Sequence, residues 1–443
     1  MTQYAVLFLS LIIWMKPLSA AHYNGRMTFG SYVSQEKHDP GYDPNTSERN
    51  DFAVSSMRLF FNATNMGRHQ DWSFLADIRD KHDFFSKLDS EKQRLTGKNS
   101  LQAYQVFAEK KNHKGFLMRV GRFTLLEAGS VFTDGAFVGW KKSTLWKVGA
   151  FAGFNPKERD QSFLTFNSNA HTYGLLGVYQ YPFSTWRKNA YYSNALVFET
   201  YKGTEDRRYF YQHFIYQWNY GCRLFSYIYW DFVPSFKVQN ANVTYNQRWT
   251  KRWRSSLALT SFDVIEYKRH QDVREQLAPS PYRQITMKAK FRKSKRFNYA
   301  GGTVWGMRIE DGLQRQEIFM GADFVRYFSK YLDAYTQLGY QHRFTNWGPF
   351  IKIGAGYFSR KQEYFIDLKW AEERQTDGTL LHPFIVDVNA SYHLSKRQFF
   401  SFSLQSAQDE RVGIGSFYFK YSYRFGDKEI PPIRDGAAPM GRL

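Results

Sequence analysis

Three residues near the end of the chain, Asp387, Ser391 and His393, are of the types that hydrolytic enzymes use. An acid, a hydroxyl and an imidazole act together only when each lies within hydrogen-bond reach of the next. Apolar and polar residues alternate around them, which predicts an extended strand, and such a strand spreads the three side chains over ~20 Å of one face. They cannot form a triad by themselves, so an enzymatic function is the least favoured.

A second group of residues shares charge rather than reactivity. On the polar face of the segments whose alternation can be read, Lys and Arg outnumber the acids Asp333, Asp367 and Asp387. Rings of Lys and Arg in a water-filled pore favour anions, and a low-dielectric wall focuses their field. The predicted pore-lining residues are Arg58, Arg119, Lys288, Lys290, Arg292, Lys352, Lys369, Lys420 and Arg424.

The elements that must position these charges are strands with two different faces. The stretch GIGSFYFKYSYRFGD, residues 413–427, carries Phe or Tyr at alternate positions, with Lys420 and Arg424 between them. Successive side chains of a strand point to opposite faces, so one face here is aromatic and the other polar. Such a strand suits a soluble sheet with its aromatic side on a core, or a membrane barrel with that side on lipid. Segments 282–292, 348–358 and 384–394 alternate in the same way.

Composition favours the barrel, although a soluble β-rich secreted protein would share it. Aromatic residues make up 19% of the 443 residues, whereas the mean hydropathy of −0.57 is that of a polar protein. After residue 21 no apolar run approaches the ~18 residues of a spanning helix. Hydrophobicity is therefore dispersed by alternation. The formal net charge of +21 does not indicate nucleic-acid binding, because no recognition module accompanies it.

Twenty-two β-like segments of about ten residues lie between residues 24 and 425, without a helical period or an interdomain linker. They predict an all-β fold: a transmembrane antiparallel up-and-down β-barrel of about 18–22 strands, twenty-two being the best count, with no plug domain. Outer-membrane barrels place long loops outside and short turns on the periplasmic side. The longest connections all follow odd-numbered segments: 35–50, 80–99, 153–170, 267–281 and 371–383. Both chain ends are therefore predicted to be periplasmic.

The first residues predict export. Residues 4–15 form an apolar run that is too short to span a bilayer, and the segment LSAA that closes residues 1–21 offers a cleavage site. We therefore expect a signal peptide at 1–21, an outer-membrane barrel at 22–425 and a periplasmic tail at 426–443. Cys222 is the only cysteine, so no internal disulfide can stabilise the exported chain.

The stretch FLMRVGRFTLLEAGSVFTDGAFVGW, residues 116–140, resembles a region of specific porins and alginate-export-type channels of the bacterial outer membrane. In those proteins a strand ending in Gly-Arg leads into a segment that folds inward, and an Asp-Gly opens the next strand. The resemblance implies that Gly121 and Arg122 end a strand, that residues 124–133 narrow the pore, and that Asp134 and Gly135 restart the wall. It places Arg122, Glu127 and Asp134 at the constriction.

The last strand resembles the terminal signal that the barrel-assembly machinery reads in such proteins, with Phe425 in the terminal place. Most porins end at that Phe, whereas this chain continues with GDKEIPPIRDGAAPMGRL. Pro431 and Pro432 exclude another central strand. The tail is predicted to be either disordered or a docking peptide for a periplasmic partner.

These patterns favour a porin-like channel in the bacterial outer membrane that passes small, preferentially anionic solutes. The alternative is a non-conducting structural or assembly barrel that holds a periplasmic partner through its tail. The implied partners are outer-membrane lipids, lipopolysaccharide, the assembly machinery during insertion and small anionic solutes, with no nucleic acid. No metal-ligand cluster, phosphate-binding loop or cofactor motif occurs in the sequence, and no cofactor is expected.

Overall fold

The chain forms a closed ring of antiparallel strands. The computed structural model describes residues 22–38, 52–67, 69–83, 99–112, 115–141, 145–156, 168–181, 189–219, 221–268 and 280–426. The wall strands are β1 (His22–His38), β2 (Phe52–Met66), β3 (Trp72–Asp83), β4 (Asn99–Lys111), β5 (Phe116–Leu125), β6 (Val131–Trp140), β7 (Trp146–Phe154), β8 (Ala170–Gln180), β9 (Asn189–Tyr201), β10 (Thr204–Asn219), β11 (Cys222–Val233), β12 (Lys237–Arg248), β13 (Trp253–Phe262), β14 (Tyr282–Arg292), β15 (Phe297–Arg308), β16 (Gln314–Ser329), β17 (Leu332–Arg343), β18 (Asn346–Phe358), β19 (Gln362–Ala371), β22 (Phe384–His393), β23 (Gln398–Gln408) and β24 (Val412–Gly426).

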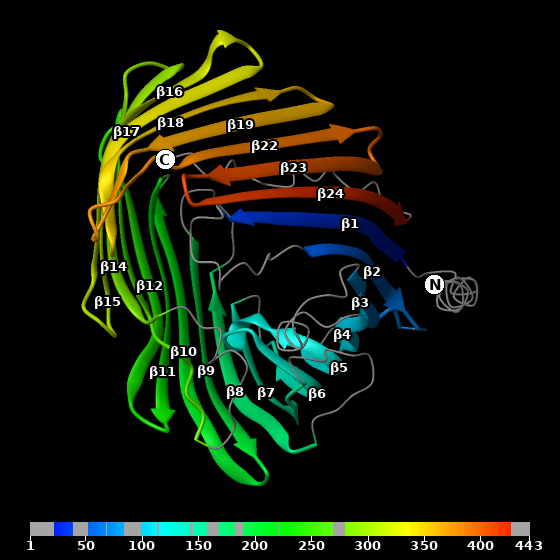
Figure 1. Cartoon of the computed structure of the whole chain (residues 1–443). Helices are drawn as coiled ribbons and strands as arrows, with labels where there is room; N and C mark the ends of the chain where they lie inside the picture. The colour runs from blue at the N-terminus through cyan, green and yellow to red at the C-terminus, as the bar shows by residue number, and fades with distance from the viewer. Residues whose placement is uncertain are drawn as a thin grey trace.

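Each wall strand pairs with the next along the chain, and the first pairs with the last. The register between β1 and β24 runs from Asn24↔Gly426 to His38↔Val412, and Figure 1 shows β1 beside β24 where the ring closes. Two of the twenty-four strands, β20 (Glu373–Gln375) and β21 (Leu380–Leu381), form a small hairpin after β19. That leaves twenty-two in the wall, which confirms the predicted up-and-down barrel and its best strand count.

Alternation along each strand separates an apolar outside from a polar inside. In β16, Ile318 and Met320 are 64% and 70% exposed, whereas Phe319 between them is 6% exposed. The same contrast places Met57, Ile353 and Phe417 outward on their strands, each being at least 44% exposed. An apolar outer face on a closed sheet suits hydrocarbon, because every backbone group of the wall finds its partner within the ring. The molecule is therefore a barrel of the bacterial outer membrane.

The long connections lie at one end of the barrel, as predicted. From the strand bounds they span residues 39–51, 84–98, 155–169, 263–281 and 372–383, each after an odd-numbered wall strand. The other end carries the start of β1, the end of β24 and the turns after even-numbered strands up to β18 and after β22. One of these, 181–188, is longer than the short turn expected there. We name the two ends the long-loop rim and the short-turn rim.

Some predictions fall outside the described residues. The signal peptide (1–21) and nearly all of the tail (426–443) do so, and both stay predictions; β24 itself extends one residue past 425, to Gly426. Within the described ranges, no helix is long and apolar enough to cross a membrane. The described part of the chain contains no plug domain, because its residues belong to the wall strands and their connections.

One hairpin leaves the wall. β5 pairs with β4 only as far as Arg122, and β6 pairs with β7 only from Asp134 onward. Residues 123–133 therefore pair only within the β5–β6 hairpin, from Phe123↔Thr133 to Leu125↔Val131. Three glycines stand side by side at the bend, in the register Gly121↔Gly135↔Gly153.

Gly121 is the member of this row whose backbone angle also requires glycine. Its φ is 127°, and a Cβ there would lie 2.3 Å from the carbonyl oxygen of Val106. Residues with a side chain rarely adopt this φ. The bend in β5 thus depends on glycine for both its backbone angle and the approach of β4.

We predict that Gly121→Ala lowers the free energy of unfolding by at least the ~1–3 kcal/mol of backbone strain, measured by urea titration of the refolded barrel in lipid vesicles. Gly415→Ala is the matched control, because no atom lies within 4 Å of a Cβ built at that outward position. Equal stability of the two variants would contradict the role assigned to Gly121.

Candidate functional site

The tip of the β5–β6 hairpin packs against the inner face of the strands further along the barrel wall, β8 to β11. A 3-10 turn, η2 (Leu126–Ala128), closes the hairpin and contacts β8 and β9. The hydroxyl of Tyr229 on β11 donates to the carbonyl oxygen of Gly129 at 2.9 Å. A Cβ on Gly129 would lie 3.1 Å or less from the rings of Tyr211 and Tyr229. Both tyrosines therefore point into the barrel, and residues 123–133 form a shelf inside it.

An apolar cluster fills the space between this hairpin and the wall. Phe123 and Leu125 from β5 are 0% and 1% exposed, and they pack with Phe137, Val197 and Tyr209. Segments 190–201 and 208–218, which form most of β9 and β10, have aromatic residues on both parities, so their faces could not be assigned from sequence. The aromatic side chains that face inward form the surface on which the hairpin docks. Their rings contact one another in a chain along the wall: Tyr191, Tyr209, Tyr211, His213, Phe225, Tyr227 and Tyr229.

A buried ion pair lies at the base of the hairpin. Arg122 Nε donates to Asp134 Oδ1 at 2.6 Å and Nη2 donates to Oδ2 at 2.7 Å, and both side chains are about 5% exposed. Arg122 Nη1 also donates to the carbonyl oxygen of Ala103 at 3.3 Å. Ala103 lies on the part of β4 that β5 no longer covers. The guanidinium thus replaces a lost ladder hydrogen bond at the point where the hairpin leaves the wall.

The strand limits expected from the resemblance were wrong, although the pairing limits agree with it. β5 does not end at Gly121 and Arg122 but continues to Leu125, and β6 begins at Val131 rather than Asp134. The physical reason is that the segment between them stays hydrogen-bonded to itself as a hairpin after it separates from β4 and β7. The wall does end at Arg122 and resume at Asp134.

Glu127 lies on the 3-10 turn and forms an ion pair with a residue of the barrel wall. Its Oε1 accepts from Lys147 Nζ on β7 at 2.7 Å. Leu126 beside it is 68% exposed, so an apolar side chain stands free at the tip of the shelf. Of the three residues expected at the constriction, Arg122 and Asp134 therefore anchor the hairpin, and Glu127 lies at its tip.

All nine residues expected to line the pore lie on the strand parity opposite the exposed apolar side chains. Lys288, Lys290 and Arg292 alternate with outward Ile285 and Met287, for example. The others stand opposite outward residues in the same way, Arg58 beside Met57, Arg119 beside Val120, Lys352 beside Ile353, Lys369 beside Trp370, and Lys420 and Arg424 on the parity opposite Phe417. Their contribution to conduction remains a proposal.

Acidic partners that the sequence did not reveal neutralise part of this charge. Arg58 bonds Asp77 on β3 at 2.5 Å, and Arg119 bonds Glu109 on β4 at 2.6 Å. Lys290 forms an ion pair with Asp323, two strands away on β16. The sequence-based comparison used residues of β2, β5, β14, β17, β18, β19, β22 and β24 but none of β3, β4 or β16, so Asp77, Glu109 and Asp323 were missed. Period-two parity on β3, β4 and β16 is the signal that could have found them.

Registers arrange the charges of one sector in two levels. Lys290, Lys352 and Lys369 fall on one transverse row of the wall, and Asp323, Asp367 and Asp387 fall on the next. Lys352 pairs diagonally with Asp367 at 2.8 Å. Lys369 instead donates to Gln341 at 3.1 Å. This sector is therefore lined by both signs of charge rather than by cations alone.

The catalytic residue types that opened the sequence stay separated on one strand. Asp387, Ser391 and His393 share the inner face of β22, where six positions of extended chain keep the outer two ~20 Å apart. Within the described residues, no group of three His, Cys, Asp or Glu side chains could hold a metal ion.

A closed ring of twenty-two antiparallel strands, apolar outside and charged inside, with one hairpin folded into the lumen, is a porin-type barrel of the outer membrane. No protein-family model matches the chain, and no curated protein matches it. The solved structures that resemble it include OpdQ from Pseudomonas aeruginosa, with 8% identity over 92% of this chain and 98% of that one, at a TM-score of 0.42.

Two further structures are similar to a comparable extent. OccAB2 from Acinetobacter baumannii has 7% identity over 92% of this chain and 98% of that one, at a TM-score of 0.44. OpdK from Pseudomonas aeruginosa, solved with vanillate, has 10% identity over 91% and 99%, at 0.41. At these values the likeness concerns the overall architecture, and the function proposed below rests on residues of this chain.

We predict that Arg122→Met lowers the free energy of unfolding by about 3–5 kcal/mol, because it leaves the Asp134 carboxylate buried without its partner. Arg122→Met/Asp134→Leu should recover most of that loss, since no charge is then left uncompensated. Both are measured by urea titration of the barrel in lipid vesicles.

Arg308→Gln is the control for this pair, because Arg308 bonds Asp311 at an exposed position where ion pairs contribute little. A double variant as unstable as Arg122→Met would contradict the role given to the uncompensated charge.

Proposed function

We propose that the chain is a passive outer-membrane channel whose lumen admits small solutes and favours anions. The observation that carries the proposal is an excess of basic side chains on the inner face that the acidic residues do not balance. Lys288 is exposed and forms no ion pair with any residue that the structure describes. Arg26 and Arg424 are direct neighbours in the β1–β24 register, although like charges directly opposite each other destabilise a sheet.

Two arginines side by side on the inner wall concentrate positive potential where an anion passes. Lys420, four residues before Arg424, extends the basic surface along β24. The anion preference is expected to be moderate, because the paired sectors at Arg58, Arg119, Lys290 and Lys352 contribute charge of both signs.

The inward hairpin supports a pore of limited width rather than an open one. A twenty-two-strand ring encloses a wide space unless something occupies it. Residues 123–133 occupy part of it, and the buried cluster and the Tyr229 hydrogen bond hold them in place. We assign the hairpin as the constriction, with exposed Leu126 and the Glu127–Lys147 pair as the groups nearest a passing solute.

We expect purified, refolded protein to conduct in planar bilayers and to show an anion-selective reversal potential under a salt gradient. Lys288→Gln/Lys290→Gln/Arg292→Gln should lower the anion-to-cation permeability ratio by roughly 2-fold or more, because it removes three lumen cations and frees Asp323. Lys288→Arg/Lys290→Arg keeps the charge and is the matched control. An unchanged reversal potential in the neutralised variant would contradict the proposed selectivity.

The constriction is tested separately. Replacing residues 124–132 by Asn-Gly leaves Phe123 and Thr133 joined by a two-residue hairpin turn and keeps the Arg122–Asp134 pair. Single-channel conductance should at least roughly double, because the shelf no longer fills the lumen. An unaltered conductance from barrels that are folded, as shown by their heat-modifiable migration on gels, would remove the hairpin from that role.

A further inference from the structure

The two rims of the barrel differ in how their charges are balanced. At the short-turn rim, the five turns at 249–252, 293–296, 330–331, 359–361 and 394–397 contain ten cations and no acidic residue. All ten side chains are exposed. They are Lys251, Arg252, Lys293, Lys295, Arg296, Lys330, Arg360, Lys361, Lys396 and Arg397. Apart from Lys396, which has a further interaction, none forms an ion pair with a described residue.

At the long-loop rim, by contrast, basic side chains have acidic partners. Arg308 forms an ion pair with Asp311 there, and the Arg308 guanidinium lowers the pKa of the Asp311 carboxyl. Arg411 lies 3.4 Å from Asp377, and hydrogen bonds from Thr379 lower the pKa of Asp377 first, with Arg411 adding to the effect. His382 bonds Glu410 at 2.7 Å. Acidic side chains therefore stand beside the cations at this end, whereas the five turns of the short-turn rim contain none.

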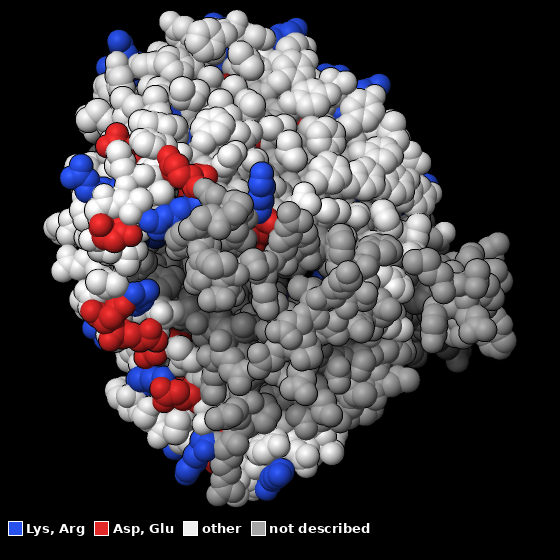
Figure 2. All heavy atoms as spheres, in the orientation of Figure 1, with Lys and Arg blue, Asp and Glu red and all other residues white. Residues whose placement is uncertain are grey.

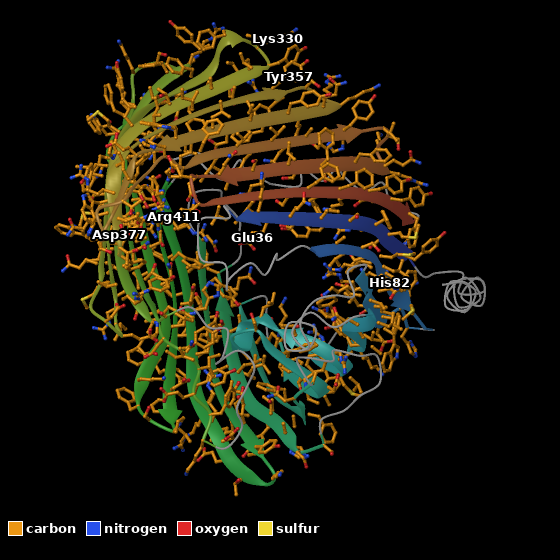
Figure 3. All side chains as sticks on the ribbon, viewed as in Figure 1. Glu36, His82, Lys330, Tyr357, Asp377 and Arg411 are labelled. Atoms are coloured by element: carbon orange, nitrogen blue, oxygen red, sulfur yellow. The ribbon has the colours of Figure 1, made fainter. Side chains whose placement is uncertain are left out.

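The views of the molecule agree with this difference. Figure 3 places Asp377 and Arg411 at the long-loop end on the left, and Lys330 at the short-turn end at the top. Figure 2 shows the visible acidic side chains gathered on the left, interleaved with basic ones, whereas blue and white spheres form the upper edge.

Exposed aromatic side chains accompany the cations of the short-turn rim. Trp249 and Trp253, on either side of Lys251 and Arg252, are 66% and 49% exposed. Phe328, two residues before Lys330, is 65% exposed. Trp and Tyr gather where a membrane protein meets the lipid headgroups, so this belt marks the headgroup level of the leaflet around the short-turn rim. The cations therefore lie at the depth of lipid phosphates.

We propose that the short-turn rim binds the phosphate headgroups of anionic phospholipids in the surrounding leaflet. Clusters of Lys and Arg beside a membrane attract anionic lipids, and here the cations other than Lys396 form no ion pair with a residue that the structure describes. The cationic turns extend from β12 to β23, around about half of the ring. A leaflet encircles the barrel and matches such an arc, whereas a single peptide or protein domain would match one patch of it. Because short turns face the periplasm, the inner leaflet supplies these lipids.

A dye attached at one rim measures which lipids surround it. In a Cys222→Ser background, Ser294→Cys places the dye between Lys293 and Lys295, and Thr376→Cys places it at the long-loop rim. The full-length protein is reconstituted in vesicles, and quenching by brominated phosphatidylglycerol is compared with quenching by brominated phosphatidylcholine at equal mole fraction. We expect about 3-fold or more preference for phosphatidylglycerol at position 294 and none at 376. Salt near 1 M, with a Debye length of ~3 Å, should abolish it.

Two charge variants identify the cause. Lys251→Gln/Arg252→Gln/Lys295→Gln should remove most of the preference at position 294. Lys202→Gln/Lys268→Gln/Arg374→Gln removes equal charge from the long-loop rim and should leave it unchanged. Equal quenching by the two lipids at position 294, persistence of the preference in the first variant, or its loss in the second would each overturn the proposal. One further result would overturn it: no lipid preference, together with cosedimentation of the protein with peptidoglycan sacculi that is lost in the first variant. The rim would then bind the cell-wall polymer.

Discussion

The need to pair every backbone group in hydrocarbon is the constraint on which the rest of this structure depends. A sheet satisfies it only by closing on itself, and closure forces each strand to show one face to lipid and the other to the lumen. The period-two pattern that sends Ile318 and Met320 outward sends Phe319 inward. The same alternation decides where charge can be placed, so the lumen collects nearly all the Lys, Arg, Asp and Glu of the wall.

The hairpin at residues 123–133 is the one place where this constraint is relaxed. Its backbone leaves the ladder of the ring, so the strands beside it lose partners. The carbonyl oxygen of Ala103, which β5 no longer pairs with, accepts a hydrogen bond from Arg122, and that guanidinium is neutralised by Asp134. A glycine with a left-handed φ and a row of neighbouring glycines allow the bend. The constriction therefore depends on the ion pair and the glycines at its base.

The number of strands and the faces of several were predictable from sequence, because alternation is a local property. Lys288 and Lys290 were assigned to the polar face from their neighbours alone. Parity could have placed the acids on the inner face, but which cation each one pairs with depends on register and was not predictable. Lys290 forms its ion pair with Asp323 across β15, where Ala300 is its register partner. Which side chains of β9 and β10 face inward could not be assigned for another reason, because aromatic residues occupy both parities of these strands.

The hydrogen bond from Tyr229 to Gly129 joins residues 100 positions apart in the chain, which orders the events of assembly. The hairpin is made early, but the tyrosines that receive it arrive with β10 and β11. Contacts of such sequence separation form late, because the intervening chain must be ordered first. Ring closure pairs β1 with β24, whose partners lie nearly the whole chain apart, so by the same rule it follows the docking of the hairpin. A newly inserted copy therefore has its constriction in place when its ring closes.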